Sequence, residues 1–215
     1  MNIAISGSSR GIGSAIAQKF LEEGHSVFGF DIKESGISHP RYTHFIADVR
    51  GFEPPEGIDP HVIISNAGTL EERDALEVNL SGGIRFAEAF YGSPNLRSVL
   101  FIASASARNG AEFPYYVASK AGLVGYMKNR ALELAKRGVT CNSISPGGVV
   151  TESNRHILES GELYEAVKAE TLLGKWAQPE EIAELAYYLT CVNRSITGED
   201  ILIDNGEMLK SNFIW

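Results

Sequence analysis

The chain has 215 residues, 44% of them hydrophobic and 21% charged, which fits one globular domain with a sizeable core and excludes a disordered or fibrous protein. Its formal net charge of -8 argues against nucleic acid and against anionic membrane surfaces as partners, so small molecules are the expected ligands. Two cysteines in apolar stretches, no signal peptide or membrane span, and five histidines without metal-ligand spacing predict a cytoplasmic protein that binds no metal.

The first predicted unit is a strand at Asn2–Ser6, followed at once by a glycine turn and a helix. Gly7, Gly11 and Gly13 form the turn, and apolar residues at helical spacing continue until Gly24. Such a junction brings backbone N–H groups and the positive end of a helix to one place, where a pyrophosphate can bind. The spacing is GxxxGxG and not the GxGxxG fingerprint, so the turn alone leaves nucleotide binding and a simple tight turn as equal alternatives.

Six further strands follow, with helical patterns between most of them. They are Ser26–Asp31, Thr43–Ala47, His61–Ser65, Ser98–Ala103, Val139–Ile144 and Asp200–Asp204. Their continuous apolar character is typical of strands that are covered on both faces. We therefore predict an α/β fold, a Rossmann-type doubly wound parallel sheet of about seven strands with helices on both faces, in one domain over residues 1–215.

One connection differs from the others. The segment between Asp48 and His61 contains Pro54, Pro55 and Pro60, which exclude a helix interior there. A parallel crossover needs about a dozen residues, so the segment can cross the sheet as a loop or a single turn.

Tyr116 and Lys120 stand four residues apart in a stretch with a helical pattern. Side chains at this spacing lie on one face of a helix, so a phenol and an ammonium group can reach one target. A nearby cation favours the charged form of a phenol and makes it a usable proton donor near neutral pH. From this spacing alone, an ordinary solvated helix surface is favoured, and other motifs have to decide.

Several such motifs occur in a fixed order. They are Ser6-Gly7 with Gly11-Ile12-Gly13, Asp48-Val49, Asn66-Ala67-Gly68, Asn79, Tyr116 with Lys120, and Pro146-Gly147-Gly148-Val149-Val150-Thr151. In this order the chain resembles the short-chain dehydrogenase/reductase family, in its compact single-domain branch, over nearly its whole length. The resemblance implies an oxidoreductase that interconverts a secondary alcohol and a ketone by hydride transfer with NAD or NADP.

The resemblance also implies a catalytic set, Asn79, Ser104, Tyr116 and Lys120. In that set Tyr116 is the general acid and base, Ser104 bonds to the carbonyl oxygen, and Lys120 tunes Tyr116 and holds the nicotinamide ribose. Asn79 supports a water that relays protons from Lys120. Ser106 is the alternative to Ser104, which is favoured because a residue at a strand end is held more rigidly than one in a loop.

The residues expected to bind the dinucleotide belong largely to the same motifs. They are Gly7, Ser9, Arg10, Gly11, Ile12, Gly13, Asp31, Asp48, Val49, Asn66, Ala67, Gly68, Tyr116, Lys120, Pro146, Gly147, Val149 and Thr151. Asp31 lies 18 residues after Gly13, where a carboxylate can accept the ribose hydroxyls of adenosine and repel the additional phosphate of NADP. We therefore predict NAD as the preferred cofactor. NADP stays the alternative, because Arg10 in the turn could hold that phosphate.

Residues 152–176 match the segment that covers the substrate in relatives, and their apolar residues recur at roughly helical intervals. Near the end of the chain, Asn205 replaces a glycine of the family pattern and can adopt a positive φ. The resemblance further implies a homo-oligomer, a dimer or a tetramer. The apolar tail at 210–215 suggests docking onto a neighbour or onto the same core.

Two alternatives to this enzyme class make different demands on the sequence. A catalytically silent dinucleotide sensor could use the same fold, but it has no need of the complete catalytic set. A dehalogenase on this scaffold should lack the glycine turn and carry Arg in place of Lys120, and neither trait is present.

Overall fold

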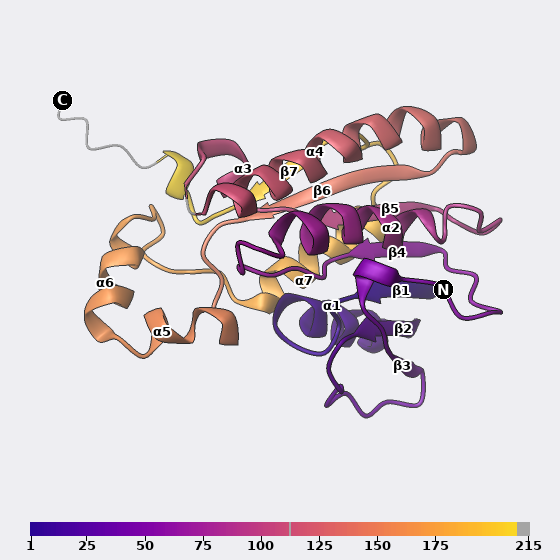
Figure 1. Cartoon of the computed structure of the whole chain (residues 1–215), viewed down its shortest axis with the longest axis horizontal. Coiled ribbons are helices and arrows are strands. Elements are labelled where there is room, and N and C mark those ends of the chain that lie inside the picture. The colour runs from indigo at the N-terminus through magenta and orange to yellow at the C-terminus, as the bar shows by residue number, and fades with distance from the viewer. Residues whose placement is uncertain (112, 210–215) are drawn as a thin grey trace.

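Seven parallel strands form one sheet in the order β3-β2-β1-β4-β5-β6-β7 (Figure 1). The computed structural model describes residues 1–111 and 113–209. The strands are β1 Asn2–Ser6, β2 Ser26–Asp31, β3 Tyr42–Ile46, β4 Val62–Ser65, β5 Ser98–Ile102, β6 Thr140–Pro146 and β7 Asp200–Ile203. The predicted doubly wound α/β architecture is confirmed.

Every predicted strand is present, and its ends agree with the prediction to within two residues. The largest difference is at β6, which continues past Ile144 because Ser145 and Pro146 pair with Leu202 and Ile203 of β7. The apolar pattern stops before these residues, since neither serine nor proline is favoured in a strand interior. Pairing with β7 decides the end of the strand.

Helices cover both faces of the sheet. They are α1 Gly11–Glu22, α2 Gly83–Glu88, α3 Ser106–Asn109, α4 Pro114–Leu134, α5 Arg155–Leu158, α6 Gly161–Ala169 and α7 Pro179–Tyr187. The shorter turns are η1 Val49–Gly51, η3 Ala135–Arg137, η4 Glu152–Asn154 and η6 Glu207–Leu209, and the π-helical turns are η2 Leu76–Gly82 and η5 Tyr188–Val192.

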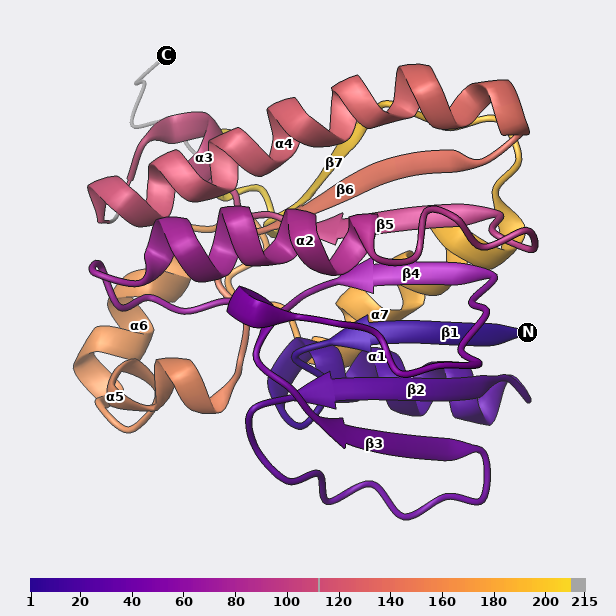
Figure 2. The same cartoon turned by 45° about the vertical axis from the view of Figure 1, so that its right-hand side comes forward.

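Two hydrophobic cores lie on opposite sides of the strands. α1 and α7 pack on one face, and α2 and α4 pack on the other, as Figure 2 shows. Successive residues of β1 contribute alternately to the two cores. Ile3 and Ile5 belong to the core with α1 and α7, and Ala4 belongs to the core with α2 and α4. Because both sides of each central strand are buried, its sequence is apolar throughout.

The crossover from β3 to β4 contains no α-helix, as predicted, and its only regular element is the short turn η1. Phe52, which is 5% exposed, supplies the packing that a helix would otherwise give. Its ring centroid lies 5.2 Å from that of Phe30, 4.8 Å from Phe86 and 5.8 Å from Phe90. An aromatic cluster therefore covers the α2 side of β2.

The turns at Gly24 and Asn205 and the state of the two cysteines also match the predictions. Gly24, just after α1, has a φ of 84°, and Asn205 has a positive φ of 55°. Cys141 and Cys191 are both free, and burial raises the pKa of the Cys141 thiol to about 12. The apolar tail at 210–215 lies outside the described residues. Among the helices that are described, none combines the length and the apolar character needed to cross a membrane.

We predict that Phe52→Ala lowers the free energy of unfolding by about 3 kcal/mol, because truncating a buried phenylalanine leaves a cavity. Urea denaturation followed by circular dichroism measures this change. Leu209→Ala is the control, since Leu209 is 77% exposed, and it should change stability by less than about 0.5 kcal/mol. Equal effects of the two substitutions would show that the aromatic cluster does not support the crossover.

Candidate functional site

The carboxyl ends of β1 and β4 adjoin at the point where the strand order reverses. Gly7 follows β1, and its N–H group bonds to the carbonyl oxygen of Phe30 at 2.7 Å. Asn66 follows β4, and its side-chain amide donates to the carbonyl oxygens of Ser6 at 3.1 Å and Gly7 at 2.9 Å. The Ser6 hydroxyl accepts the N–H groups of Asn66 and Ala67 at 3.0 and 3.1 Å. The two motifs are therefore joined at one sheet edge.

The glycine turn allows a phosphate group to approach the backbone closely. Gly7 and Gly11 have φ values of 67° and 52°, which glycine adopts without strain. A Cβ atom on Gly13 would overlap the carbonyl oxygen of Gly7. α1 begins at Gly11, and the Arg10 side chain makes no capping hydrogen bond to it. The first N–H groups of the helix, including that of Ile12, are thus suited to an anion, and the turn fits a pyrophosphate.

Asp31 lies beside this turn, at the end of β2. Its Oδ2 accepts the N–H group of Ser9 at 3.0 Å, and its Oδ1 accepts that of Lys33 at 3.0 Å. The Ser9 hydroxyl in turn donates to the Lys33 carbonyl oxygen at 2.9 Å. Because each carboxylate oxygen can accept a further hydrogen bond, Asp31 is fixed in orientation and can still receive a pair of hydroxyl groups.

Arg10 extends from the turn toward the segment that follows β6. Its guanidinium lies 3.8 Å from the Glu152 carboxylate, and these side chains are 50% and 57% exposed. Exposed pairs of this kind contribute about 0–1 kcal/mol, so a phosphate group could compete for Arg10.

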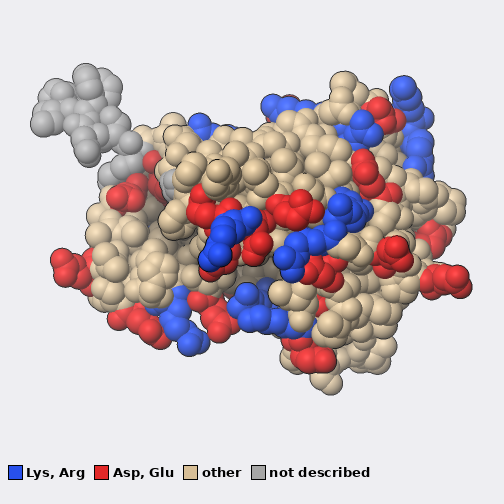
Figure 3. Space-filling model, viewed as in Figure 1, with Lys and Arg blue, Asp and Glu red and all other residues tan. Residues whose placement is uncertain are grey.

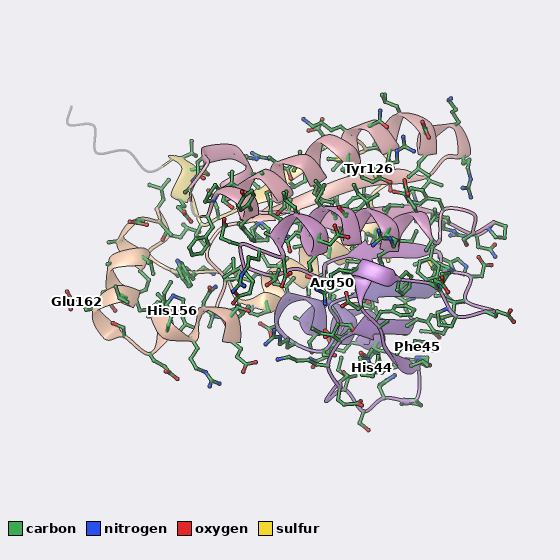
Figure 4. The ribbon with its side chains drawn as sticks, in the orientation of Figure 1. His44, Phe45, Arg50, Tyr126, His156 and Glu162 are labelled. Atoms are coloured by element: carbon green, nitrogen blue, oxygen red, sulfur yellow. The ribbon has the colours of Figure 1, made fainter. Side chains whose placement is uncertain are left out.

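Asp48 and Val49 follow β3, and Asp48 is bonded to Arg50, a residue that the sequence analysis did not single out. The Asp48 carboxylate accepts the backbone N–H of Arg50 at 2.9 Å and its guanidinium at 2.9 and 2.6 Å. These bonds hold the pKa of Asp48 below its ordinary value. Val49 is buried against Gly82 of η2. Figure 4 labels Arg50 at this crossover turn, where it partners Asp48, one of the residues expected to bind the dinucleotide.

Tyr116 and Lys120 both lie near the start of α4, at the helical spacing that their sequence positions predict. Lys120 is 4% exposed, and its Nζ donates to the carbonyl oxygen of Ile102, the last residue of β5, at 2.9 Å. The same nitrogen lies 5.8 Å from the centroid of the Tyr116 ring. A buried ammonium group at this distance favours negative charge on the phenol, which suits proton transfer.

Asn79 lies in the π-helical turn η2, the predicted bend. Its Oδ1 accepts the N–H group of Thr69 at 2.7 Å, and its Nδ2 donates to Thr69 O at 3.0 Å and to the Ser119 hydroxyl at 3.1 Å. The Ser119 hydroxyl donates to the Tyr116 carbonyl oxygen at 2.7 Å. The buried amide therefore connects the loop after β4 to the helix that carries Tyr116.

Gly68 separates Asn79 from Lys120. A Cβ atom at this glycine would lie 3.3 Å from Asn79 Oδ1 and 3.4 Å from Lys120 Nζ. Because glycine has no side chain, the loop after β4 can approach both the amide oxygen and the ammonium group closely.

Ser104 follows β5 and continues its pairing with β6. The N–H groups on either side of it, from Ala103 and Ala105, bond to the carbonyl oxygens of Ile144 and Pro146 at 2.8 Å each. Ser104 is buried, and its Oγ lies 2.6 Å from that of Ser106. The two alternative serines are therefore neighbours, with Ser104 in the strand extension and Ser106 at the start of α3.

The segment after β6 passes beside the glycine turn. The Thr151 methyl would be 3.5 Å from a Cβ on Gly11. Val149 is 3% exposed and belongs to the core that contains α1, so any cofactor contact from this residue comes from its backbone. The Trp176 ring packs directly against Gly148, where a Cβ would overlap it.

Two acidic residues near the site were missed by the sequence analysis. Glu207 lies against Gly147, where a Cβ would be 2.9 Å from its Oε2, and burial raises the pKa of Glu207 above its ordinary value. Glu72 accepts the N–H groups of Tyr115 at 3.3 Å and Tyr116 at 3.5 Å. Its negative carboxylate thereby stabilises α4 by interacting with the positive N-terminal end of that helix. Neither acid belongs to a motif, and only the fold brings them to the site.

Within the segment 152–176, residues 152–169 contain η4, α5 and α6, in agreement with the predicted helical intervals. Figures 1 and 4 show this segment at the carboxyl end of the sheet, with His156 on α5 and Glu162 on α6. It stands on the same side of the molecule as α3 and the start of α4. Leu163, Leu172 and Leu173 are 49%, 55% and 69% exposed.

Charged side chains of both signs alternate over the face drawn in Figure 3, where no basic stripe is visible. Within residues 1–111 and 113–209, no three His, Cys, Asp or Glu side chains are grouped so that they could hold a metal ion.

Comparisons with known proteins agree with this geometry. The protein-family model described as enoyl-(acyl carrier protein) reductase matches residues 58–207. The chain is 28% identical to a 3-oxoacyl-(acyl-carrier-protein) reductase of Vibrio cholerae, over 94% of this chain and 95% of the relative. It is 26% identical to an L-rhamnose 1-dehydrogenase (NADP(+)) of Thermoplasma acidophilum, over 97% and 96%. The solved structure of 4-hydroxyisoleucine dehydrogenase complexed with NADH is 26% identical, with a TM-score of 0.87 and coverage of 98% and 99%.

We predict that Gly13→Ala abolishes dinucleotide binding, because the added methyl group would overlap the Gly7 carbonyl oxygen and the Asn66 amide. Quenching of protein fluorescence by NADH measures binding. Gly125→Ala is the matched control, since a Cβ on Gly125 of α4 meets no atom within 4 Å. It should keep binding and raise stability by about 0.5–1 kcal/mol, the usual gain of Ala over Gly in a helix. Normal NADH affinity in Gly13→Ala would contradict the assignment of the turn.

Proposed function

Because the chain belongs to the short-chain dehydrogenase/reductase family and is an NAD(P)-dependent oxidoreductase, we propose that it interconverts a secondary alcohol and a ketone, with Tyr116 as the general acid and base. The observation that carries this proposal is the buried Lys120 ammonium group, which lies beside the Tyr116 ring and is bonded to the end of β5. Asn79 is bonded to Ser119 of α4, the helix that carries Lys120, and Ser104 follows the end of β5.

Each residue of the set has a separate task in the proposed mechanism. Ser104 donates a hydrogen bond to the carbonyl oxygen, where negative charge develops, and Tyr116 gives the proton that completes the alcohol. Lys120 keeps a positive charge beside Tyr116 and holds the nicotinamide ribose. A nicotinamide held there would supply or accept the hydride. The proton is replaced through Lys120 and a water that the Asn79 amide supports.

A panel assay tests the activity directly. NADH and NADPH oxidation is measured with 9,10-phenanthrenequinone, simple ketones, ketosteroids and 3-oxoacyl thioesters. NAD and NADP reduction is measured with L-rhamnose, other sugars and 4-hydroxyisoleucine, the last because a structural relative bears that name. Turnover of any compound supports the proposal and defines the substrate class. A protein that binds NADH and turns over no compound would instead be the silent dinucleotide sensor.

We propose NAD as the preferred cofactor. The relatives do not decide this, since one solved structure holds NADH and one relative is named for NADP. Support comes from Asp31, whose carboxylate is held in place by two backbone N–H groups. A phosphate beside this charge would be repelled by several kcal/mol at an effective dielectric of ~20.

The proposal extends to the substrate cover and to assembly. Residues 152–176 cover a small-molecule substrate, and the chain forms a homo-oligomer, a dimer or a tetramer, through η2 and α4. Leu76 of η2 and Leu132 of α4 support such an interface, because they are 41% and 74% exposed. Light scattering on the purified protein measures the assembly, and a monomer at micromolar concentration would contradict it.

We predict that Tyr116→Phe lowers kcat by about 10²–10⁴-fold, the usual contribution of a positioned acid, while NADH affinity is retained. Tyr115→Phe is the matched control, because Tyr115 is adjacent in sequence, 54% exposed and outside the proposed set. It should keep near-normal turnover. Equal rates in the two variants would remove Tyr116 from its proposed role.

We predict that the wild-type protein binds NADH more tightly than NADPH by two or three decades, as the repulsion at Asp31 implies. Asp31→Asn removes the charge and keeps the shape, so it should reduce this preference mainly by improving NADPH binding. Arg10→Gln is the companion variant. If the wild type bound NADH and NADPH equally well and Arg10→Gln lost NADPH binding, Arg10 would outweigh the Asp31 carboxylate in the choice of cofactor.

A further inference from the structure

We infer that Ser106 is a positioning residue that orients the hydroxyl group of Ser104 toward the substrate oxygen. This inference rests on the proposed function. It starts from the 2.6 Å distance between the two Oγ atoms, in side chains that are only 9% and 4% exposed. A buried pair at this distance shares a short hydrogen bond, and each hydroxyl has one proton to donate.

The direction of this bond decides what Ser104 can do. Ser104 Oγ also accepts the backbone N–H group of Ser106 at 3.3 Å. If the Ser106 hydroxyl donates as well, both lone pairs of Ser104 Oγ are used, and its own proton must point away from Ser106. If Ser104 donates to Ser106 instead, no proton is left for a carbonyl oxygen. Only the first arrangement supports the role proposed for Ser104.

The surrounding backbone leaves the hydroxyl rotation as the main remaining freedom. α3, which begins at Ser106, is tied to β7 by Arg108, whose Nε and Nη2 donate to Asp200 Oδ2 at 2.9 and 2.8 Å. The Asp200 side chain is 7% exposed and also accepts the hydroxyls of Ser143 and Ser145 of β6 at 2.7 Å each. With α3 held in this way, the Ser106 hydroxyl sets the orientation of its neighbour.

The same strand offers a matched control. Ser98, at the opposite end of β5, is 1% exposed, and its Oγ accepts the Thr140 hydroxyl at 2.8 Å. Ser98→Ala therefore removes a buried bond between two hydroxyls, as Ser106→Ala does, but far from the proposed site. It reports the cost of losing such a bond where no chemistry depends on it.

Steady-state kinetics with NADH and 9,10-phenanthrenequinone, or the fastest carbonyl compound of the panel, test the inference. Ser106→Ala should lower kcat about 10-fold, the loss that one hydrogen bond of ordinary strength explains, with little change in KM. NADH affinity should be unchanged. Ser106→Thr, which keeps a hydroxyl, should recover most of the loss, and Ser98→Ala should keep the wild-type kcat.

A double-mutant cycle shows whether Ser106 acts through Ser104. Ser104→Ala should lower kcat about 10²–10³-fold, and adding Ser106→Ala to it should cause no further loss. The inference would be overturned if the double variant lost the product of the two single losses in kcat. A normal kcat in Ser106→Ala, or a parallel loss of kcat and NADH affinity in that variant, would overturn it as well. A fully active Ser104→Ala protein would instead refute the role of Ser104 in the proposed function. If the wild type turns over no panel compound, the proposed function fails, and this inference fails with it.

Discussion

An ammonium group can be buried only where hydrogen-bond acceptors replace its water, and Lys120 meets this requirement at the Ile102 carbonyl oxygen. The bond joins α4, which carries Tyr116, to the end of β5, which leads into Ser104. The charge proposed to tune the phenol is therefore also a tie between helix and sheet. Gly68 lies close to both this ammonium group and the Asn79 amide, so the loop after β4 and the turn η2 meet the helix at the same place.

The two halves of the sheet are covered differently. On the side of β5 and β6, the long helix α4 buries the strands and presents the proposed catalytic residues. On the side of β2 and β3, neither connection contains an α-helix, and the phenylalanine cluster around Phe52 replaces that cover. Arg50 lies in this crossover and binds Asp48, so this part of the proposed dinucleotide site depends on a turn.

Local patterns were enough to predict the strands and the pairing of Tyr116 with Lys120, because a helix or a buried strand fixes the spacing of side chains along the chain. The residues that were missed are Thr69, Ser119, Glu72, Arg50 and Glu207. Most of their contacts join segments far apart in sequence, such as Asn79 with Ser119 or Glu72 with Tyr116, and depend on how loops meet helices. The role of Phe52 was missed for a similar reason, since prolines reveal that a helix is absent but not what covers the strands.

The lack of an α-helix between β2 and β4 has a consequence for how this chain can vary. These two connections adjoin the end of the sheet that carries Asp31, the residue proposed to bind adenosine, whereas the residues proposed for bond-making and bond-breaking come from β4 onward. The helix-free connections and the proposed chemistry thus occupy separate portions of the polypeptide. Insertions between β2 and β4 could enlarge the nucleotide end, and losses there could reduce it, without shifting the register that brings Ser104, Tyr116 and Lys120 together.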